Sequence, residues 1–227
     1  MFKNLISFWK GKDFLTEVLE EFKEMLGDTK YMFESVCKGL IDGTADPILK
    51  DKTYKVDKKV NTLEKDIRKR VVEHLSIQPS VDIPVSLVLM SVVKDAERIG
   101  DYCKNLFEIT DLLHKPLKRD VFRGLFDEID KKLLDMFEMT QKAFIESDEK
   151  AAKEILQKER ILVRNCDEIL KNISKSNLTT NEAVCFTLLA RYFKRIAAHL
   201  ANIGSSVILP VSELDFFDEK LRHEKET

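Results

Sequence analysis

The chain has 227 residues, of which 44% are hydrophobic and 34% charged, with seven glycines and five prolines. This composition is too apolar for a disordered chain and too poor in glycine for a turn-rich β protein. The 38 Lys and Arg residues nearly balance 40 Asp and Glu residues, so the net charge is -2, with both signs spread along the chain. Nucleic-acid binding is not expected, because it needs basic charge gathered on one face.

Apolar residues recur at steps of three and four residues almost everywhere, which predicts an all-helical chain. Asp82 is expected to cap one of the helices. Gly43 and Pro47, then Pro79, and finally Pro116 mark the ends of three successive segments. The helices predicted for this first half of the chain span residues 13–42, 53–77 and 82–114.

The same order of elements follows Pro116. One helix is predicted from there to about residue 146, and two more cover residues 147–176 and 180–209. Long helices joined by short connections pack as antiparallel neighbours. The fold class is therefore predicted as all-α, with two tandem antiparallel three-helix bundles and a short C-terminal tail that could hold one short helix around Phe216. The expected domains are residues 1–115 and 116–210, followed by the tail at 211–227.

The third and sixth predicted helices can be aligned without a gap at an offset of 97 residues. Arg98 then falls on Arg195, and Asn105 falls on Asn202. This match predicts that the second half of the chain is an internal copy of the first half.

The spacing of the cysteines and the length of the most apolar run indicate where in the cell the protein is expected. Cys37, Cys103, Cys166 and Cys185 form no CxxC pair, so reduced, mostly buried thiols in the cytoplasm are expected. The most apolar run, at 83–93, is shorter than the roughly 20 residues that cross a bilayer, so no transmembrane segment is expected. A signal peptide is not expected at the amino terminus, because no small-residue cleavage site follows its apolar residues. Its apolar residues, and the Phe216-Phe217 pair in the tail, could each support a homodimer.

Polar residues gather on the third predicted helix, opposite its apolar stripe. Glu97 and Asp101 lie one helical turn apart, so their carboxylates can meet at one point, which hard or borderline cations accept. Gly100 between them could let another helix approach closely. The second helix carries another oxygen-bearing pair, Asp57 and Asn61. The alternative is an ordinary solvated face, since surface helices carry charges opposite their core stripe.

The motif Asp95-Ala-Glu-Arg-Ile-Gly-Asp101, followed by Asn105, closely resembles the ERIGD signature of the PhoU family of phosphate-transport regulators. The stretch Asp57-Lys-Lys-Val-Asn-Thr-Leu-Glu64 resembles the start of that family's second helix, and the resemblance extends over residues 13–209. It implies tandem three-helix bundles with E/D-xxx-D motifs that are associated with bound metal clusters. Glu97 with Asp101 matches one such motif, and Asp57 with Asn61 matches it more weakly.

The resemblance also implies a function. The chain is expected to be a cytoplasmic regulator, peripheral at the inner face of the membrane, that docks on a membrane phosphate transporter or its sensor kinase. The metal, which could be Fe, Zn, Ni, Mn or Mg, would support this docking. Its expected ligands are Glu97, Asp101, Asp57 and Asn61. Residues expected to be charge partners or docking residues beside the metal are Arg98, Asn105 and Glu108.

The second repeat departs from this pattern, because Lys194 and Ala198 stand where the family would have Glu and Asp. At most one metal site is therefore expected, in the first bundle. His199 could replace a ligand, although a structural histidine is the alternative.

Catalysis is not expected. None of the four histidines follows a Glu by three residues, as a ferritin-like di-iron site requires, and neither a nucleophile elbow nor a phosphate loop is present. A metal-free helical adaptor remains the alternative function. A redox carboxylate enzyme would need a bundle interior rich in metal ligands.

Overall fold

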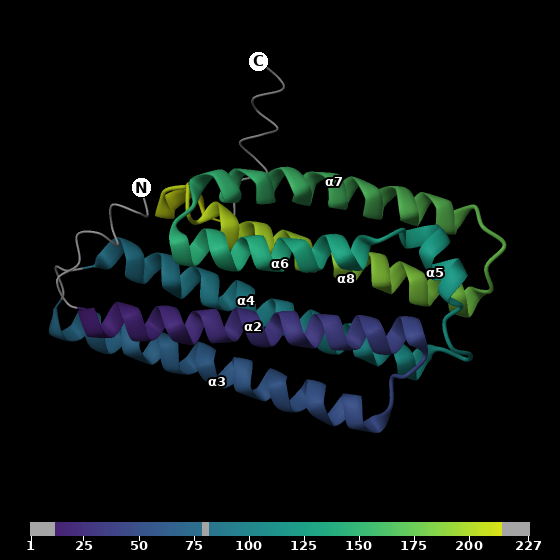
Figure 1. The fold of residues 1–227 in the computed structure, drawn as a ribbon, viewed down its shortest axis with the longest axis horizontal. Coiled ribbons are helices and arrows are strands. Elements are labelled where there is room, and N and C mark those ends of the chain that lie inside the picture. Colours follow the sequence, from purple (N-terminus) through teal and green to yellow (C-terminus); the bar gives the residue numbers. More distant parts are fainter. Residues whose placement is uncertain (1–11, 79–81, 215–227) are drawn as a thin grey trace, which may run out of the picture.

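The computed structural model describes residues 12–78 and 82–214. The long helices run side by side along one axis, and no strand occurs in these ranges (Figure 1). The predicted all-α fold class is confirmed. The helices of the described ranges are α2 (Lys12–Asp42), α3 (Pro47–Ile77), α4 (Ile83–Leu112), α5 (Arg119–Phe126), α6 (Ile129–Glu146), α7 (Glu149–Ser174), α8 (Thr180–Ser205) and the short 3₁₀ helix η1 (Val211–Glu213).

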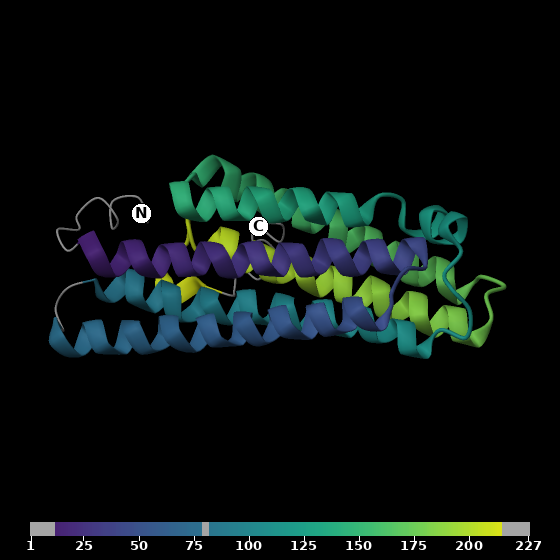
Figure 2. The ribbon, with the colours of Figure 1, turned by 60° about the horizontal axis from the view of Figure 1, so that its bottom comes forward.

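Two three-helix bundles form the fold, as predicted. Helices α2, α3 and α4 pack against one another, and so do α6, α7 and α8. The bundles also pack against each other, because α4 contacts α8 and α2 contacts α6. Figure 2 shows α2 lying between α3 and α6. The division of the chain into domains at residues 115 and 116 stays a prediction.

The second helix begins earlier than the sequence pattern indicated. Asp46 caps its first turn by accepting a hydrogen bond from the backbone N–H of Leu49 at 2.8 Å, and Pro47 occupies the first turn. A proline there removes no hydrogen bond that the helix needs. The helix therefore starts at Pro47 and not near residue 53, although apolar periodicity is weak over these first residues.

The predicted fourth helix is two helices, α5 and α6. The break lies at Asp127, whose φ of 51° is outside the helical region. Arg123 stabilises the break: its Nη1 donates to the Asp127 carbonyl at 3.0 Å, and its guanidinium holds both carboxylate oxygens of Asp130 at 2.6 and 3.1 Å. Phe122 and Phe126 on α5 are both buried. A short-range ion pair thus replaces the helical hydrogen bonds lost at the break, which periodicity could not reveal.

Asp82 is the N-cap residue of α4, as predicted, and its carbonyl accepts a hydrogen bond from the backbone N–H of Ser86 at 2.9 Å, but its side chain makes no capping hydrogen bond in the described part of the chain. Its backbone is left-handed, and its Oδ2 lies 3.1 Å from Nε2 of His74 on α3. Phe14 on α2 stacks on the same His74 ring, with centroids 4.2 Å apart. The carboxylate therefore joins α3 to α4 at the end of the bundle.

Aromatic rings tie the two bundles into one continuous core. Phe33 on α2 packs on Phe137 of α6 and Phe193 of α8, with centroids 5.5 and 5.9 Å apart. Phe22 on α2 packs on Phe144 of α6 at 4.7 Å. All of these rings are fully or almost fully buried. Neither bundle buries its apolar surface alone.

The four cysteines are free and buried, as predicted. Burial raises the pKa of Cys103 and Cys37 far above the usual thiol value. Burial also raises the pKa of Cys166 and Cys185. All four side chains are therefore held as unreactive thiols that act as small apolar groups in the core.

The contact between α4 and α8 reflects the internal repeat. The offset of 97 residues pairs Asp95 with Tyr192, and Tyr102 with His199. In the structure Asp95 contacts His199, and Tyr102 contacts Tyr192. If each residue is replaced by its equivalent in the other repeat, the contact between Asp95 and His199 becomes the contact between Tyr192 and Tyr102. An approximate two-fold axis therefore passes between α4 and α8. The duplication predicted from the alignment thus fits the geometry of the interface.

Two expectations fall outside the described residues: the apolar amino-terminal segment and the short helix around Phe216. Leu214, at the edge of the described range, is buried. Over residues 12–78 and 82–214, no helix is both long enough and apolar enough to traverse a bilayer.

Phe33→Ala is expected to lower the free energy of unfolding by about 3–5 kcal/mol, because it removes a buried ring at the junction of both bundles. Denaturant unfolding followed by circular dichroism measures this, and one transition is expected because the core is shared. Val72→Ala on the exposed face of α3 is the control, with a change within about 0.5 kcal/mol. Separate transitions for the two bundles would contradict the shared core.

Candidate functional site

The predicted site residues meet along the contact between α3 and α4, here called the α3–α4 seam. It is formed by Asp57, Asn61 and Glu64 on α3 and by Glu97, Asp101 and Lys104 on α4. The side chains of Glu97 and Asp101 are 18% and 29% exposed. Their face of α4 is therefore half covered by α3, and it is not the fully solvated face that the alternative interpretation described.

Lys104 lies at the centre of the seam. Its Nζ is 3.0 Å from Oδ2 of Asp57 and 3.0 Å from Oδ1 of Asp101. Asn61 donates from Nδ2 to the same Oδ2 of Asp57 at 3.3 Å. The structure thus brings Asp57, Asn61 and Asp101 together, as the sequence predicted, and the group at their centre is the ammonium of Lys104.

Glu97 is the least neutralised acid of the seam. Burial, together with the neighbouring charge of Asp101, raises the pKa of Glu97 to about 6. Arg98 opposes this shift, with its Nε 3.6 Å from Glu97 Oε2 and its Nη1 3.2 Å from Asp101 Oδ2. Burial also raises the pKa of Asp57. The seam therefore concentrates negative charge in a place where water screens it poorly.

The other predicted residues are Arg98, Asn105 and Glu108, all on α4. Arg98 is 55% exposed and forms the two ion pairs described above. Asn105 is half-buried. Glu108, further along α4, is exposed and accepts a hydrogen bond from the hydroxyl of Tyr54 at 2.7 Å. Arg98 and Glu108 therefore lie at the outer edge of the α3–α4 seam.

Gly100 does not serve a close helix contact. A Cβ placed there would lie 3.6 Å from Val60, 3.7 Å from Asp57 and 3.8 Å from Thr29, which are ordinary packing distances. The expectation that the glycine permits an unusually close approach is therefore wrong, because neighbouring helices leave space for a methyl group.

The seam does not fit a metal ion in this arrangement. In the described part of the chain, no group of three or more His, Cys, Asp or Glu side chains is placed to hold one. The position between Asp57 and Asp101, which a cation would need, is taken by the ammonium of Lys104. Among described residues, Asp57 Oδ1 and Asn61 Oδ1 are buried without a hydrogen-bond partner. Metal binding stays a prediction, and it would require Lys104 to move away.

In the second bundle a lysine likewise joins the third helix, α8, to the second helix, α7. Lys194 on α8, at the position of Glu97, lies with its Nζ 2.7 Å from Oδ1 of Asp167 on α7. Ala198, at the position of Asp101, offers no carboxylate. The second bundle therefore places positive charge where the resemblance predicts acids.

Sequence reasoning missed the buried polar contact between the bundles. Asp95 on α4 is only 1% exposed, and its Oδ1 accepts hydrogen bonds from His199 Nδ1 at 2.7 Å and Asn202 Nδ2 at 3.0 Å. Since a carboxylate only accepts, Nδ1 of His199 carries the proton. Tyr102 stacks on the His199 ring at 5.7 Å. His199 therefore has a structural role, and Asp95 within the quoted motif was the available signal.

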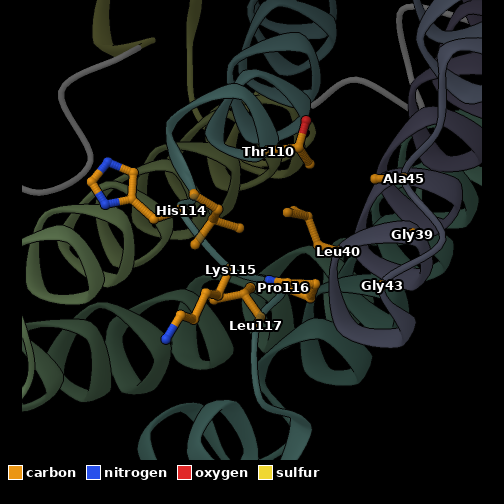
Figure 3. Close-up of a pocket in the computed structure, with 10 residues that line it drawn as sticks. Gly39, Leu40, Gly43, Ala45, Thr110, His114, Lys115, Pro116 and Leu117 are labelled. Carbon is orange, nitrogen blue, oxygen red and sulfur yellow. The ribbon is translucent and has the colours of Figure 1, made fainter.

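A small cavity lies where the first bundle meets the connection to the second. It measures about 190 Å³ and is bordered by the ends of α2 and α4 and by residues 113–117. Figure 3 shows His114 and the amine of Lys115 pointing away from Leu40, which lies at the cavity. Ligand pockets are usually larger and contain convergent polar groups, so this cavity does not define a binding site.

The fold and the α3–α4 seam define the class of the protein. It consists of two tandem helical bundles, and in each bundle charged side chains join the second helix to the third. A family model described as PhoU domain matches residues 22–110 and 126–207, once in each bundle. The chain belongs to the PhoU family. The resemblance found in residues 95–101 is thereby confirmed.

The similar curated proteins are named as accessory proteins of phosphate-specific transport systems. The accessory protein PhoU homolog 1 of Thermotoga maritima is 32% identical over 92 residues, which cover 40% of this chain and 38% of that protein. The PhoU homolog of Aquifex aeolicus is 27% identical over 159 residues, covering 65% of this chain and 69% of that protein. The chain thus matches little more than a third of the Thermotoga protein's length.

Solved structures agree in fold. PhoU from Pseudomonas aeruginosa matches with a TM-score of 0.75 and 22% identity, over 86% of this chain and 95% of that one. The phosphate transport system regulatory protein PhoU from Streptococcus pneumoniae matches with a TM-score of 0.72 and 20% identity, over 90% of this chain and 97% of that one. At these identities the likeness concerns the fold alone.

Glu97→Gln is expected to stabilise the protein at neutral pH. Because folding raises the pKa of Glu97 from 4.5 to about 6, the folded state binds this proton more tightly, and the free energy of unfolding falls as pH rises between these values. The glutamine avoids that loss, so denaturant unfolding at pH 7.5 should show a gain of about 1 kcal/mol that is absent at pH 4. Glu34→Gln, on the exposed face of α2, is the control with no gain. A gain of the same size at both pH values would contradict the assigned cause.

Gly100→Ala is expected to raise the free energy of unfolding by about 1 kcal/mol, because alanine favours the helix and its methyl group fits. Gly204→Ala on α8 is the matched control. Its Cβ would lie 3.2 Å from Ile155, so any gain there is offset by crowding. Thermal unfolding of both variants makes the comparison, and a less stable Gly100→Ala would show that the seam cannot accept the methyl group.

Proposed function

We propose that this protein regulates phosphate transport or phosphate signalling by docking on a membrane phosphate transporter or its sensor kinase, as a cytoplasmic protein at the inner face of the membrane. The observation that carries the proposal is the match of both bundles to the PhoU domain. Its relatives bear the name of accessory proteins of phosphate-specific transport systems. An accessory protein acts through a partner, which fits regulation by binding and not by turnover.

The rigidity of the two bundles suits this role. The shared aromatic core and the contact of Asp95 with His199 hold the bundles in one orientation, so a partner meets a preformed surface. A preformed surface loses less conformational entropy on binding than a flexible one.

The metal-free form of this function is favoured over metal-supported docking. Lys104 already neutralises the two carboxylates that would hold the ion, Asp57 and Asp101. We therefore propose docking that depends on the bundles themselves, with the exposed rim of the α3–α4 seam as part of the docking surface. Arg98 and Glu108 are exposed charges of that rim.

Deletion of the gene is expected to raise phosphate uptake by phosphate-replete cells, because the transporter loses its regulator. Uptake of radiolabelled phosphate measures this, together with binding of the purified full chain to membranes that contain the cell's phosphate transporter or its sensor kinase. The wild-type gene should restore low uptake, and Arg98→Glu should restore less of it and bind less well.

The control is Glu154→Arg, a charge reversal on the exposed face of α7 in the other bundle, which should behave as the wild type. Unchanged uptake on deletion, with no binding to either membrane protein, would reject the proposed function. Equal loss in the two variants would reject the rim of the seam as the docking surface.

A further inference from the structure

We infer that Lys104 is the resident cation of the α3–α4 seam: its ammonium takes the place of a divalent ion between Asp57 and Asp101, so the native chain binds none there, and removing the amino group creates a divalent-cation site. This inference concerns the seam itself and does not rest on the proposed docking function.

The geometry of the ammonium is that of a shared cation. Nζ of Lys104 lies at 3.0 Å from one oxygen of each carboxylate, and these two carboxylates belong to different helices. A lysine ammonium is a compact point charge with three donors, so it can serve two acceptors at once. Lys104 therefore joins α3 to α4 by the same electrostatic bridge that a metal ion would supply.

The burial of Asp57 makes a cation necessary. This residue is 7% exposed, and a buried carboxylate without a positive partner carries a large desolvation cost. Its Oδ1 has no hydrogen-bond partner among the described residues even with Lys104 in place. Loss of the ammonium would leave Asp57 and Asp101 beside Glu97, while Arg98 at the exposed edge would still pair with Glu97 and Asp101.

The second bundle supplies an independent parallel. Lys194 reaches from α8 to Asp167 on α7, just as Lys104 reaches from α4 to Asp57 on α3. The two lysines occupy different positions of the repeat, since the offset of 97 residues places Lys194 on Glu97. Both bundles therefore use a lysine of the third helix to join the second helix, from two different positions.

The test compares Mn²⁺ binding by the full-length wild type, Lys104→Ala and Lys104→Arg. Mn²⁺ suits this site because it prefers oxygen ligands, and its electron paramagnetic resonance signal separates bound from free ion. The wild type and Lys104→Arg should bind no stoichiometric Mn²⁺ after dialysis. Lys104→Ala should bind about one ion per chain, and added Mn²⁺ should raise its melting temperature, since a ligand stabilises the state that binds it.

Lys50→Ala is the matched control. Lys50 also joins α3 to α4, with its Nζ 3.1 Å from Oδ2 of Asp111, but this is an exposed pair with a single carboxylate. Its removal should not create Mn²⁺ binding. Adding Asp57→Asn to Lys104→Ala should abolish the gained binding, which places the ion in the seam.

Two results would overturn the inference: stoichiometric Mn²⁺ in the wild type that Asp57→Asn removes, or a folded Lys104→Ala that binds no Mn²⁺. If Lys104→Ala does not fold, Lys104→Met keeps the length of the side chain without its charge and is measured in its place. The Mn²⁺ measurements use purified protein without a transporter. Their result is therefore independent of the docking experiment, and either proposal can be rejected while the other stands.

Discussion

The structure depends on one contact, the packing of α4 against α8. Each of these helices is the third of its bundle, and each must bury one face inside its own bundle and a second face against the other bundle. Buried positions therefore extend around most of both helices. Such a helix has little surface left for solvated polar groups, and a polar residue on it needs a partner within the protein.

Two polar clusters follow from this constraint. On the side of α4 that faces α8, Asp95 Oδ1 accepts hydrogen bonds from His199 and Asn202, and this polar contact joins the two repeats. On the side that faces α3, Lys104 pairs with one carboxylate oxygen of Asp101 and one of Asp57. Buried hydrogen-bonded charges of this kind fix one arrangement of neighbouring helices more strictly than apolar packing alone does.

The repeat pattern shows how a duplicated bundle can keep its shape while its charged residues change. The contacts of Asp95 with His199 and of Tyr102 with Tyr192 occupy equivalent places about the two-fold axis, yet one is polar and the other aromatic. Likewise Lys194 and Asp167 join α8 to α7 without the acids of the first bundle. The backbone arrangement is common to both repeats, and each joins its helices with different chemistry.

The sequence by itself determined the helical class, most helix ends and the two-bundle order, because apolar periodicity and proline positions act locally along the chain. It also determined that Glu97 shares a face of its helix with Asp101, and Asp57 with Asn61, since helical spacing fixes which residues of one helix lie together. Only the tertiary structure decided that Lys104 lies between Asp57 and Asp101, that Asp95 pairs with His199, and that the fourth predicted helix breaks at Asp127, where Arg123 binds Asp130. When the partner of a charged residue lies on another helix or beyond a break, the pairing depends on how the helices pack. The residue pattern of one helix contains no information about the helix beside it.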